Sequence, residues 1–170
     1  MNKNIQILVA LVEDHPGVLH RISSLFSRRR FNIISLTVGQ TERKGLSRMT
    51  IVVDSSSTNV EQVIKQMYKI INVLKVSDVT KDATVVRETA LIKINATKSN
   101  RTEVLQMVEI FRGKVVDVTL DSLIVEMSSH PEKINSFIEL VSSFGIKELV
   151  RTGATVMNRG KSGEVKLKKK

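Results

Sequence analysis

The feature of this sequence that most restricts its fold is an order of hydrophobic patterns that occurs twice. In each half, a strand-like run is followed by a run with helical spacing, two further strand-like runs, a second helical run and a last strand-like run. This strand–helix–strand–strand–helix–strand order is typical of the ferredoxin-like arrangement. In the first half the strands are predicted at 5–12, 31–40, 46–54 and 73–80, and the helices at 17–30 and from about residue 60.

The second half repeats this order although few of its residues match the first half, so the duplication lies in the pattern. We predict an α+β fold with two ferredoxin-like βαββαβ domains in tandem, at 1–80 and 89–158. A polar linker is predicted at 81–88 and a basic, disordered tail at 159–170. In the second domain the strands are predicted at 89–96, 115–120, 123–127 and 146–157, the last one interrupted by Gly153. The helices are predicted between Asn100 and Gly113 and between Pro131 and Gly145.

The patterns also predict which faces are buried. The first strand is apolar at almost every residue, so both of its faces should be covered. The second strand should lie at an edge of its sheet, where unpaired backbone groups can bind another chain. The second helix is predicted to begin with a capping box of Thr58 and Glu61. Its predicted apolar face consists of Val60, Val63, Ile64, Met67, Tyr68 and Ile71.

The composition argues against several classes of protein. The chain has no Cys, so it has no disulfide or thiolate site. Its first apolar run is too short to span a membrane, and neither a cleavage site nor a targeting leader is evident, so we expect a cytoplasmic protein. The net charge of +10 raises nucleic acid as a partner, but half of that charge lies in 159–170. Aromatic residues are only 4%, too few for base stacking, so no nucleic-acid partner is expected.

The candidate site is the polar turn that joins the first strand to the first helix. Pro16 is tolerated in a first helical turn, and Gly17 has no Cβ to keep a ligand from its backbone. The N–H groups of Gly17, Val18 and Leu19 would lack helical partners, and such donors bind a carboxylate. Asp14 could hold an ammonium group. The turn therefore predicts an amino-acid site, although the same pattern also serves as an ordinary helix start.

Catalytic patterns are scarce. The three histidines, His15, His20 and His130, lack metal-ligand spacing, and we find neither a nucleophile elbow nor a phosphate-binding glycine loop. Asp14 beside His15 is better interpreted as a solvated turn than as an acid–base pair. Asn32 is either a turn residue or part of a binding site. No catalytic or metal site is predicted.

Several longer stretches carry a resemblance to a known family. LVEDHPGVLHRISSLFSRRRFNIISLTVG at 11–39, followed by LSRMTIVV at 46–53, resembles the ACT domain of the small, regulatory subunit of acetolactate synthase, also called acetohydroxyacid synthase. The likeness continues through VRETALIKI at 86–94, EIFRGKVVDVT at 109–119 and RTGATVMNRG at 151–160. It covers nearly the whole chain except the Lys-rich tail, and the order and spacing of these motifs make it specific.

The resemblance implies a non-catalytic partner of a large catalytic subunit. That large subunit is a transferase that carries thiamine diphosphate, Mg and often FAD. The large subunit condenses two pyruvates to acetolactate, or pyruvate with 2-oxobutyrate, at the first common step toward valine, leucine and isoleucine. The small subunit binds no cofactor. The small subunit raises activity and confers feedback inhibition, usually by valine. Such a subunit works in the cytoplasm, or in the plastid stroma when plastid-encoded.

The resemblance also implies where the effector binds. ACT domains of this family form homodimers side by side, with L-valine in the interface. Carried over residue by residue, one chain supplies Asp14, Gly17, Val18 and Leu19, and the partner supplies Asn32 and Ile33. Relatives often have Asn where this chain has Asp14; an aspartate accepts from an ammonium group but cannot donate to a carboxylate.

Two alternatives stay open at this point. The first is a stand-alone amino-acid-binding ACT module that regulates another partner. The second is an RNA-binding protein, because some RNA-binding domains share this strand order. That reading requires an aromatic-rich strand, and the candidate, SRMTIVV at 47–53, has no aromatic residue.

Overall fold

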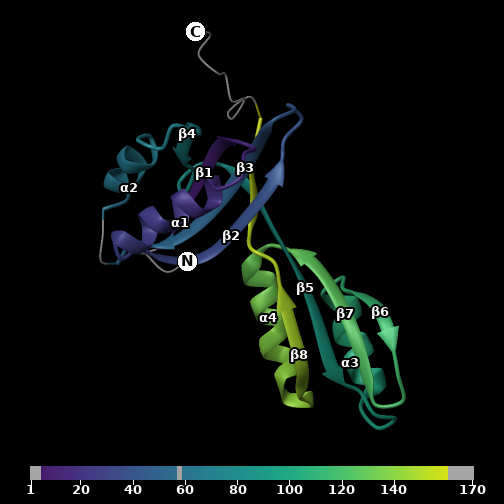
Figure 1. Ribbon diagram of the computed structural model, residues 1–170. Helices are drawn as coiled ribbons and strands as arrows, with labels where there is room; N and C mark the ends of the chain where they lie inside the picture. The colour runs from purple at the N-terminus through teal and green to yellow at the C-terminus, as the bar shows by residue number, and fades with distance from the viewer. Residues whose placement is uncertain (1–4, 57–58, 161–170) are drawn as a thin grey trace. The chain divides into compact units, whose positions relative to one another are not determined.

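The computed structural model describes residues 5–56 and 59–160, which divide into two compact units (Figure 1). The first unit contains the chain up to residue 85 together with the segment from residue 154, and the second contains 86–153. The disorder predicted for the tail concerns 161–170 almost entirely, and these residues lie outside the described part. No helix among the described residues is long and apolar enough to cross a membrane.

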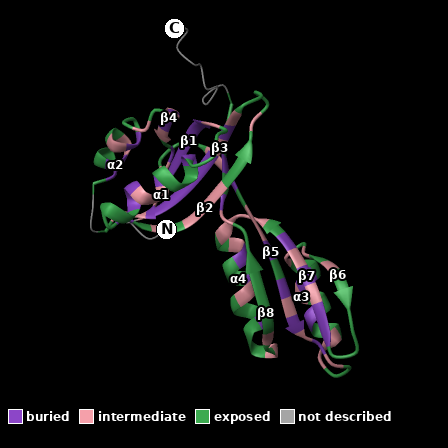
Figure 2. Ribbon diagram, in the orientation of Figure 1, coloured by how far each residue is buried: buried purple, intermediate pink, exposed green. Residues whose placement is uncertain are grey.

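The first unit has the predicted order of strands and helices. Its four strands form an antiparallel sheet in the order β2-β3-β1-β4, so β2 lies at an edge, as predicted. Figure 2 shows β2 mostly half-buried or exposed, whereas β1 and β3 are largely buried. The elements are β1 (Ile5–Glu13), α1 (Val18–Arg28), β2 (Asn32–Gln40), β3 (Leu46–Asp54), α2 (Val60–Met67) and β4 (Val73–Asp78).

Both faces of β1 are buried, which confirms the prediction from its continuous apolar run. Leu8, Ala10 and Val12 pack in one core with the apolar faces of α1 and α2. Val9 and Leu11, which point to the opposite face, are also buried. On that side the segment from residue 154 returns to the first unit. One guanidinium nitrogen of Arg48 in β3 donates to the carbonyl of Val156 at 3.0 Å.

The second unit repeats the topology with its own core. Its sheet runs β6-β7-β5-β8, and a further strand, β9 (Thr155–Asn158), pairs with β5. Fully buried side chains from α4 and the sheet, including Phe137, Ile92 and Val125, fill the core. The elements are β5 (Thr84–Asn95), α3 (Arg101–Ile110), β6 (Lys114–Val118), β7 (Ser122–Ser129), α4 (Pro131–Val141), a short 3-10 turn (Ser142–Phe144) and β8 (Ile146–Arg151).

Two predicted boundaries near the ends of the second domain are wrong. The linker expected at 81–88 is shorter, because β5 already begins at Thr84. The residues from Thr84 to Val86 are β-branched, which favours a strand although polar residues flank them. The interruption expected at Gly153 in the last strand is confirmed, because β8 ends at Arg151 and β9 begins at Thr155. The domain end expected at 158 is wrong, because the chain from residue 154 belongs to the first unit.

The prediction for the second helix also needs correction. Helix α2 ends at Met67, so Tyr68 and Ile71 do not join its buried face, and Ile71 is 84% exposed. The hydroxyl of Tyr68 instead donates to the carbonyl of Val76 in β4. Thr58 of the expected capping box lies outside the described residues. The N-cap is Asn59, whose side chain accepts from the amide of Glu61 at 2.9 Å.

Candidate functional site

The turn between β1 and α1 is held by its backbone. The amide of Asp14 donates to the carbonyl of Gly45 at 2.8 Å, which fixes the turn to the β2–β3 hairpin. Gly17 has φ +84°, a left-handed conformation that suits glycine, and a Cβ built there would meet no atom within 4 Å. Gly17 therefore leaves open space beside the backbone at the start of the helix.

Hydrogen bonds among Asn72, Glu13 and Arg21 hold the turn in place. The side-chain amide of Asn72 donates to Glu13 at 2.7 Å, and the guanidinium of Arg21 donates to the Asn72 carbonyl oxygen at 2.8 Å. The backbone carbonyl of Asn72 also accepts from the amide of Glu13. This role of Asn72 could not be predicted from the sequence, because its hydrogen-bond partners lie far away along the chain.

The six predicted site residues divide by exposure. Asp14, Gly17, Leu19 and Asn32 are exposed, and no described residue hydrogen-bonds or pairs with the Asp14 carboxylate. Ile33 is half-buried against the core. The side chains of Asp14, Leu19 and Asn32 and the backbone of Gly17 are therefore accessible from solvent.

Val18 can take part in the site only through its backbone, which is the group that the sequence predicts there. Its side chain is only 4% exposed and packs in the core with the apolar face of α1. Its amide donates to the carbonyl of His15 at 3.3 Å, and the helix begins at Val18 rather than at Gly17. Of the three backbone donors predicted for the turn, one is therefore engaged by the turn itself.

One chain does not bring the two halves of the predicted site together. Glu13, which precedes the turn, pairs with Leu46 at one end of β3, whereas Asn32 pairs with Asp54 at the other end. The eight steps from Leu46 to Asp54 span about 26 Å in a strand. A ligand that touches both Asp14 and Asn32 therefore needs them from different chains.

The edge strand β2 carries exposed apolar side chains. Ile34 is 50% exposed and Val38 is 45% exposed, and Leu36 is half-buried between them. An edge strand with apolar side chains is a template for pairing with a second chain. This edge is the surface of the first unit that can complete the site.

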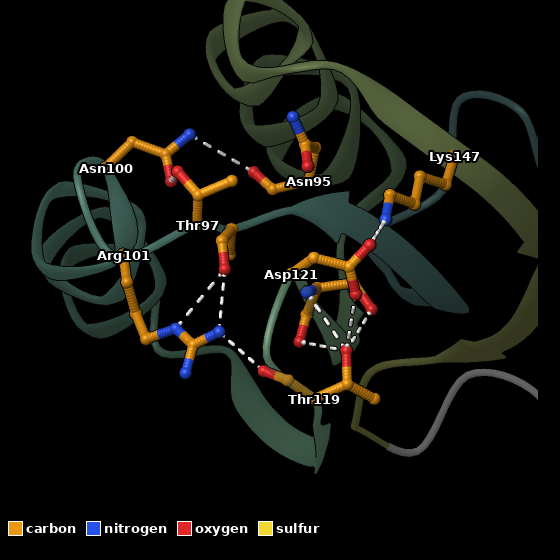
Figure 3. Close-up of polar contacts among 9 residues, drawn as sticks. Asn95, Thr97, Asn100, Arg101, Thr119, Asp121 and Lys147 are labelled. Carbon is orange, nitrogen blue, oxygen red and sulfur yellow. Dashed lines mark hydrogen bonds and ion pairs between the residues drawn. The ribbon is translucent and has the colours of Figure 1, made fainter.

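The corresponding turn of the second unit is closed by its own side chains (Figure 3). The guanidinium of Arg101 donates to the carbonyls of Ala96 and Thr119, and its Nη2–Ala96 distance is 2.7 Å. The side-chain amide of Asn100 donates to the carbonyl of Asn95 at 3.4 Å. Because these groups satisfy one another, this turn offers no open ligand site.

The histidines make local contacts. His15 Nε2 lies 3.9 Å from Glu13 Oε2, and His130 Nδ1 accepts from the amide of Glu132 at 3.4 Å as the N-cap of α4. Within 5–56 and 59–160, no three acidic or histidine side chains gather as metal ligands. The described residues thus show no cluster of side chains that could hold a metal ion.

Comparison with known proteins gives consistent matches. A family model described as an AHAS small subunit-like ACT domain matches residues 8–75, and one described as the small subunit of acetolactate synthase matches 87–160. A protein of Methanothermobacter thermautotrophicus with the name "Probable acetolactate synthase small subunit" is 48% identical over 94% of this chain and 96% of its own.

Two further relatives agree. The acetolactate synthase small subunit of Mycolicibacterium smegmatis is 47% identical over 92% of both chains. The crystal structure of the acetolactate synthase small subunit from Thermotoga maritima superposes with a TM-score of 0.83 at 40% identity, and covers 92% of this chain and 98% of its own. These matches cover both units.

Proposed function

The chain belongs to the family of acetolactate synthase small subunits, and from that premise we propose that it activates a catalytic large subunit and makes it sensitive to valine. The large subunit holds thiamine diphosphate, Mg and, in many members of the family, FAD, and condenses two pyruvates to acetolactate with loss of CO2. Valine is an end product of branched-chain amino acid biosynthesis. Its binding to this chain is the feedback signal.

The observation that carries the valine proposal is the placement of the two half-sites. The turn at Asp14–Gly17 and the residue Asn32 lie at opposite ends of one sheet, and β2 lies at the edge between two potential copies. In a homodimer joined through β2, Asn32 of one chain approaches the turn of the other chain. Twofold symmetry then gives two equivalent sites at the interface.

The register of β2 sets the geometry of this dimer. Leu36 is the middle residue of β2, so antiparallel pairing centred there places Asn32 opposite the partner's Gln40. Gln40 pairs with Ser47, and Ser47 pairs with Val12 at the start of the turn. Asn32 then lies about 14 Å, or three strand spacings, from Val12 at the start of the partner's turn. Two side chains and a bound amino acid span that distance.

The turn suits the two ends of an amino acid. Asp14 presents an unpaired carboxylate that accepts from the ligand ammonium group. Backbone amides at the start of α1, with the positive end of the helix dipole, attract the ligand carboxylate. Leu19 is exposed beside them and contacts the apolar side chain. One methylene group changes the binding free energy in an apolar site by about 1–3 kcal/mol, and this margin separates valine from leucine and isoleucine as effectors.

Inhibition follows from linkage. Valine lowers activity because it binds more tightly to the dimer arrangement in which the large subunit is less active. A ligand that bridges two chains couples its own binding to the geometry of their interface. The effector thus acts on the complex without contacting the catalytic cofactors.

The direct test is acetolactate formation by the matching large subunit alone, with this chain, and with this chain plus L-valine. We expect activity to rise with the chain and to fall again with valine. A rise without a valine effect would contradict the valine site and keep the partner. No rise with both proteins folded would overturn the regulatory role and favour a stand-alone amino-acid-binding module.

Variants locate the site. Gly17→Asp fills the open space with a side chain and a negative charge, and Asn32→Ala removes the amide contributed by the partner. We expect both to abolish the valine response and to leave activation intact. Gln62→Ala, an exposed amide on α2, is the matched control and should respond normally. A normal valine response in both site variants would show that the site is misassigned.

A further inference from the structure

A cavity of about 450 Å³ lies on the face of the first sheet opposite α1 and α2, away from the turn and from Asn32. Its floor is formed by Val9 and Leu11 of β1, and its rim by the β2–β3 hairpin and the chain near residue 158. The volume lies within the range of small-molecule sites, about 300–1,000 Å³. All of its lining residues belong to the first unit.

The strand register places two cations over the apolar floor. Leu11 pairs with Lys75 on one side and with Arg48 on the other, so the three side chains share one face of the sheet. The Cα atoms of Lys75 and Arg48 are therefore about 10 Å apart, at two strand spacings. Next to Arg48 in the same row lies Gly39, where a Cβ would meet no atom within 4 Å. The missing side chain leaves the cavity open above this row.

Cationic side chains outnumber carboxylates at the cavity. Arg43, Arg48 and Lys75 line it with a single carboxylate, Glu42, whose Oε1 lies 3.6 Å from Arg43 Nε. Lys75 forms no ion pair with any residue that the structure describes. Burial lowers the pKa of Arg48, and the charge of Glu42 acts in the opposite direction. The half-buried guanidinium thus lacks full compensation by the protein.

We propose that this cavity is a second effector site, which binds a small organic anion with its carboxylate or phosphate between Arg48 and Lys75 and its short apolar body against Val9, Leu11 and Val79. The guanidinium of Arg48 is already oriented, because one of its nitrogens donates to Val156 at 3.0 Å. Its other donors, and the ammonium of Lys75, serve the anion. The chain's own end is not the occupant, because 161–170 carries five lysines and one glutamate.

The chemistry separates this ligand from valine. A free amino acid brings an ammonium group, which the cations at this cavity repel. An anion that has an apolar body and no ammonium group fits both the charge and the floor. The two sites therefore discriminate between ligands by the presence of the amino group.

The test uses the full chain, uniformly labelled with ¹⁵N, and isovalerate as the probe. We expect saturable shifts of amide signals at Val9, Arg48 and Lys75, and none with isovaleramide, which has the same shape without the charge. Inorganic phosphate distinguishes the anionic group: tighter binding than isovalerate would identify a phosphorylated ligand. Absence of saturable shifts with both anions, or equal binding of isovaleramide, would overturn the proposal.

Two substitutions make the assignment specific. Lys75→Met should weaken isovalerate binding about tenfold, the effect of one lost charge-assisted contact. Lys93→Met, a half-buried lysine of β5 in the second unit, is the matched control and should leave binding unchanged. Gly17→Asp should leave isovalerate binding intact. The proposal for the valine site and the proposal for this cavity can therefore be refuted independently. Unchanged binding in Lys75→Met would refute the site.

Discussion

The turn between β1 and α1 and the turn between β5 and α3 hold the same position in two copies of one topology, but they differ in what occupies them. The first contains a left-handed glycine, Gly17, and the unpaired carboxylate of Asp14. The second is filled by Arg101 and Asn100, which hydrogen-bond to the carbonyls around them (Figure 3). The difference teaches that the local residues decide whether the turn at this position stays open or is filled by side chains.

The largest effect is expected from opening the closed turn. Arg101→Ala removes the donor shared by the carbonyls of Ala96 and Thr119 and leaves both carbonyls without it. Because these are hydrogen bonds from a charged group, we expect the second unit to lose about 2–3 kcal/mol of unfolding free energy. Urea unfolding measures the loss, and Lys114→Ala, an exposed lysine of β6, is the control. A variant as stable as the parent would mean that Arg101 does not hold this turn.

A smaller effect is expected from straining the open turn. Gly17→Ala has room for the new Cβ, so its cost comes from the left-handed backbone alone, about 1–2 kcal/mol. Gly145→Ala in the second unit carries the same kind of strain, with φ +92° and its nearest atom at 3.7 Å. Thermal unfolding compares the two variants, and inhibition assays separate them. We expect only Gly17→Ala to weaken the valine response; equal weakening in both would mean that strain, and not the site, causes it.

The sequence allowed the order of elements and the edge position of β2 to be predicted, because hydrophobic periodicity is local and the topology follows from it. The cavity on the face of Arg48 was not predicted. The available signal was this single cation within the largely apolar strand β3. Which distant residues line the cavity depends on how β4 and the chain near residue 158 pack against β1.

The predictions that the structure contradicts have a common physical origin. The transfer of β9 out of the second unit depends on contacts such as Arg48 with Val156, which are 108 residues apart along the chain. The early end of α2 leaves Ile71 exposed although its spacing fits the helical face. The first helix begins at Val18, one residue after its predicted start at Gly17, since helical spacing does not show where the first turn begins. The closing role of Arg101 is likewise set by a distant strand end.

The next prediction tests whether Asp14 serves a ligand rather than the fold. Asp14→Ala should leave unfolding free energy unchanged, because no described residue pairs with its carboxylate. It should raise the valine concentration for half-inhibition about tenfold through loss of one charge-assisted hydrogen bond. Asp14→Asn keeps an acceptor and should lose less. Asp117→Ala, an exposed aspartate of β6, is the control; a loss of stability in Asp14→Ala alone would assign the residue to the fold.

The smallest effect concerns Asp121, which follows β6 at the closed end of the second unit. A hydrogen bond from Lys147, with one from Thr119 and the lysine charge, lowers the pKa of this carboxyl below its ordinary value. A lowered folded-state pKa means that the ionised form is favoured by folding, so its stabilisation is present above about pH 4 and is lost as pH falls through the folded-state pKa.

Carbon-13 NMR titration of the Asp121 carboxyl should therefore show a pKa below the ordinary value of an aspartate, and Lys147→Met should return it toward that value. If the Asp121 carboxyl titrates the same way with and without Lys147, the ion pair does not contribute to closing this end of the unit. The two turns would then differ only through Arg101 and Asn100.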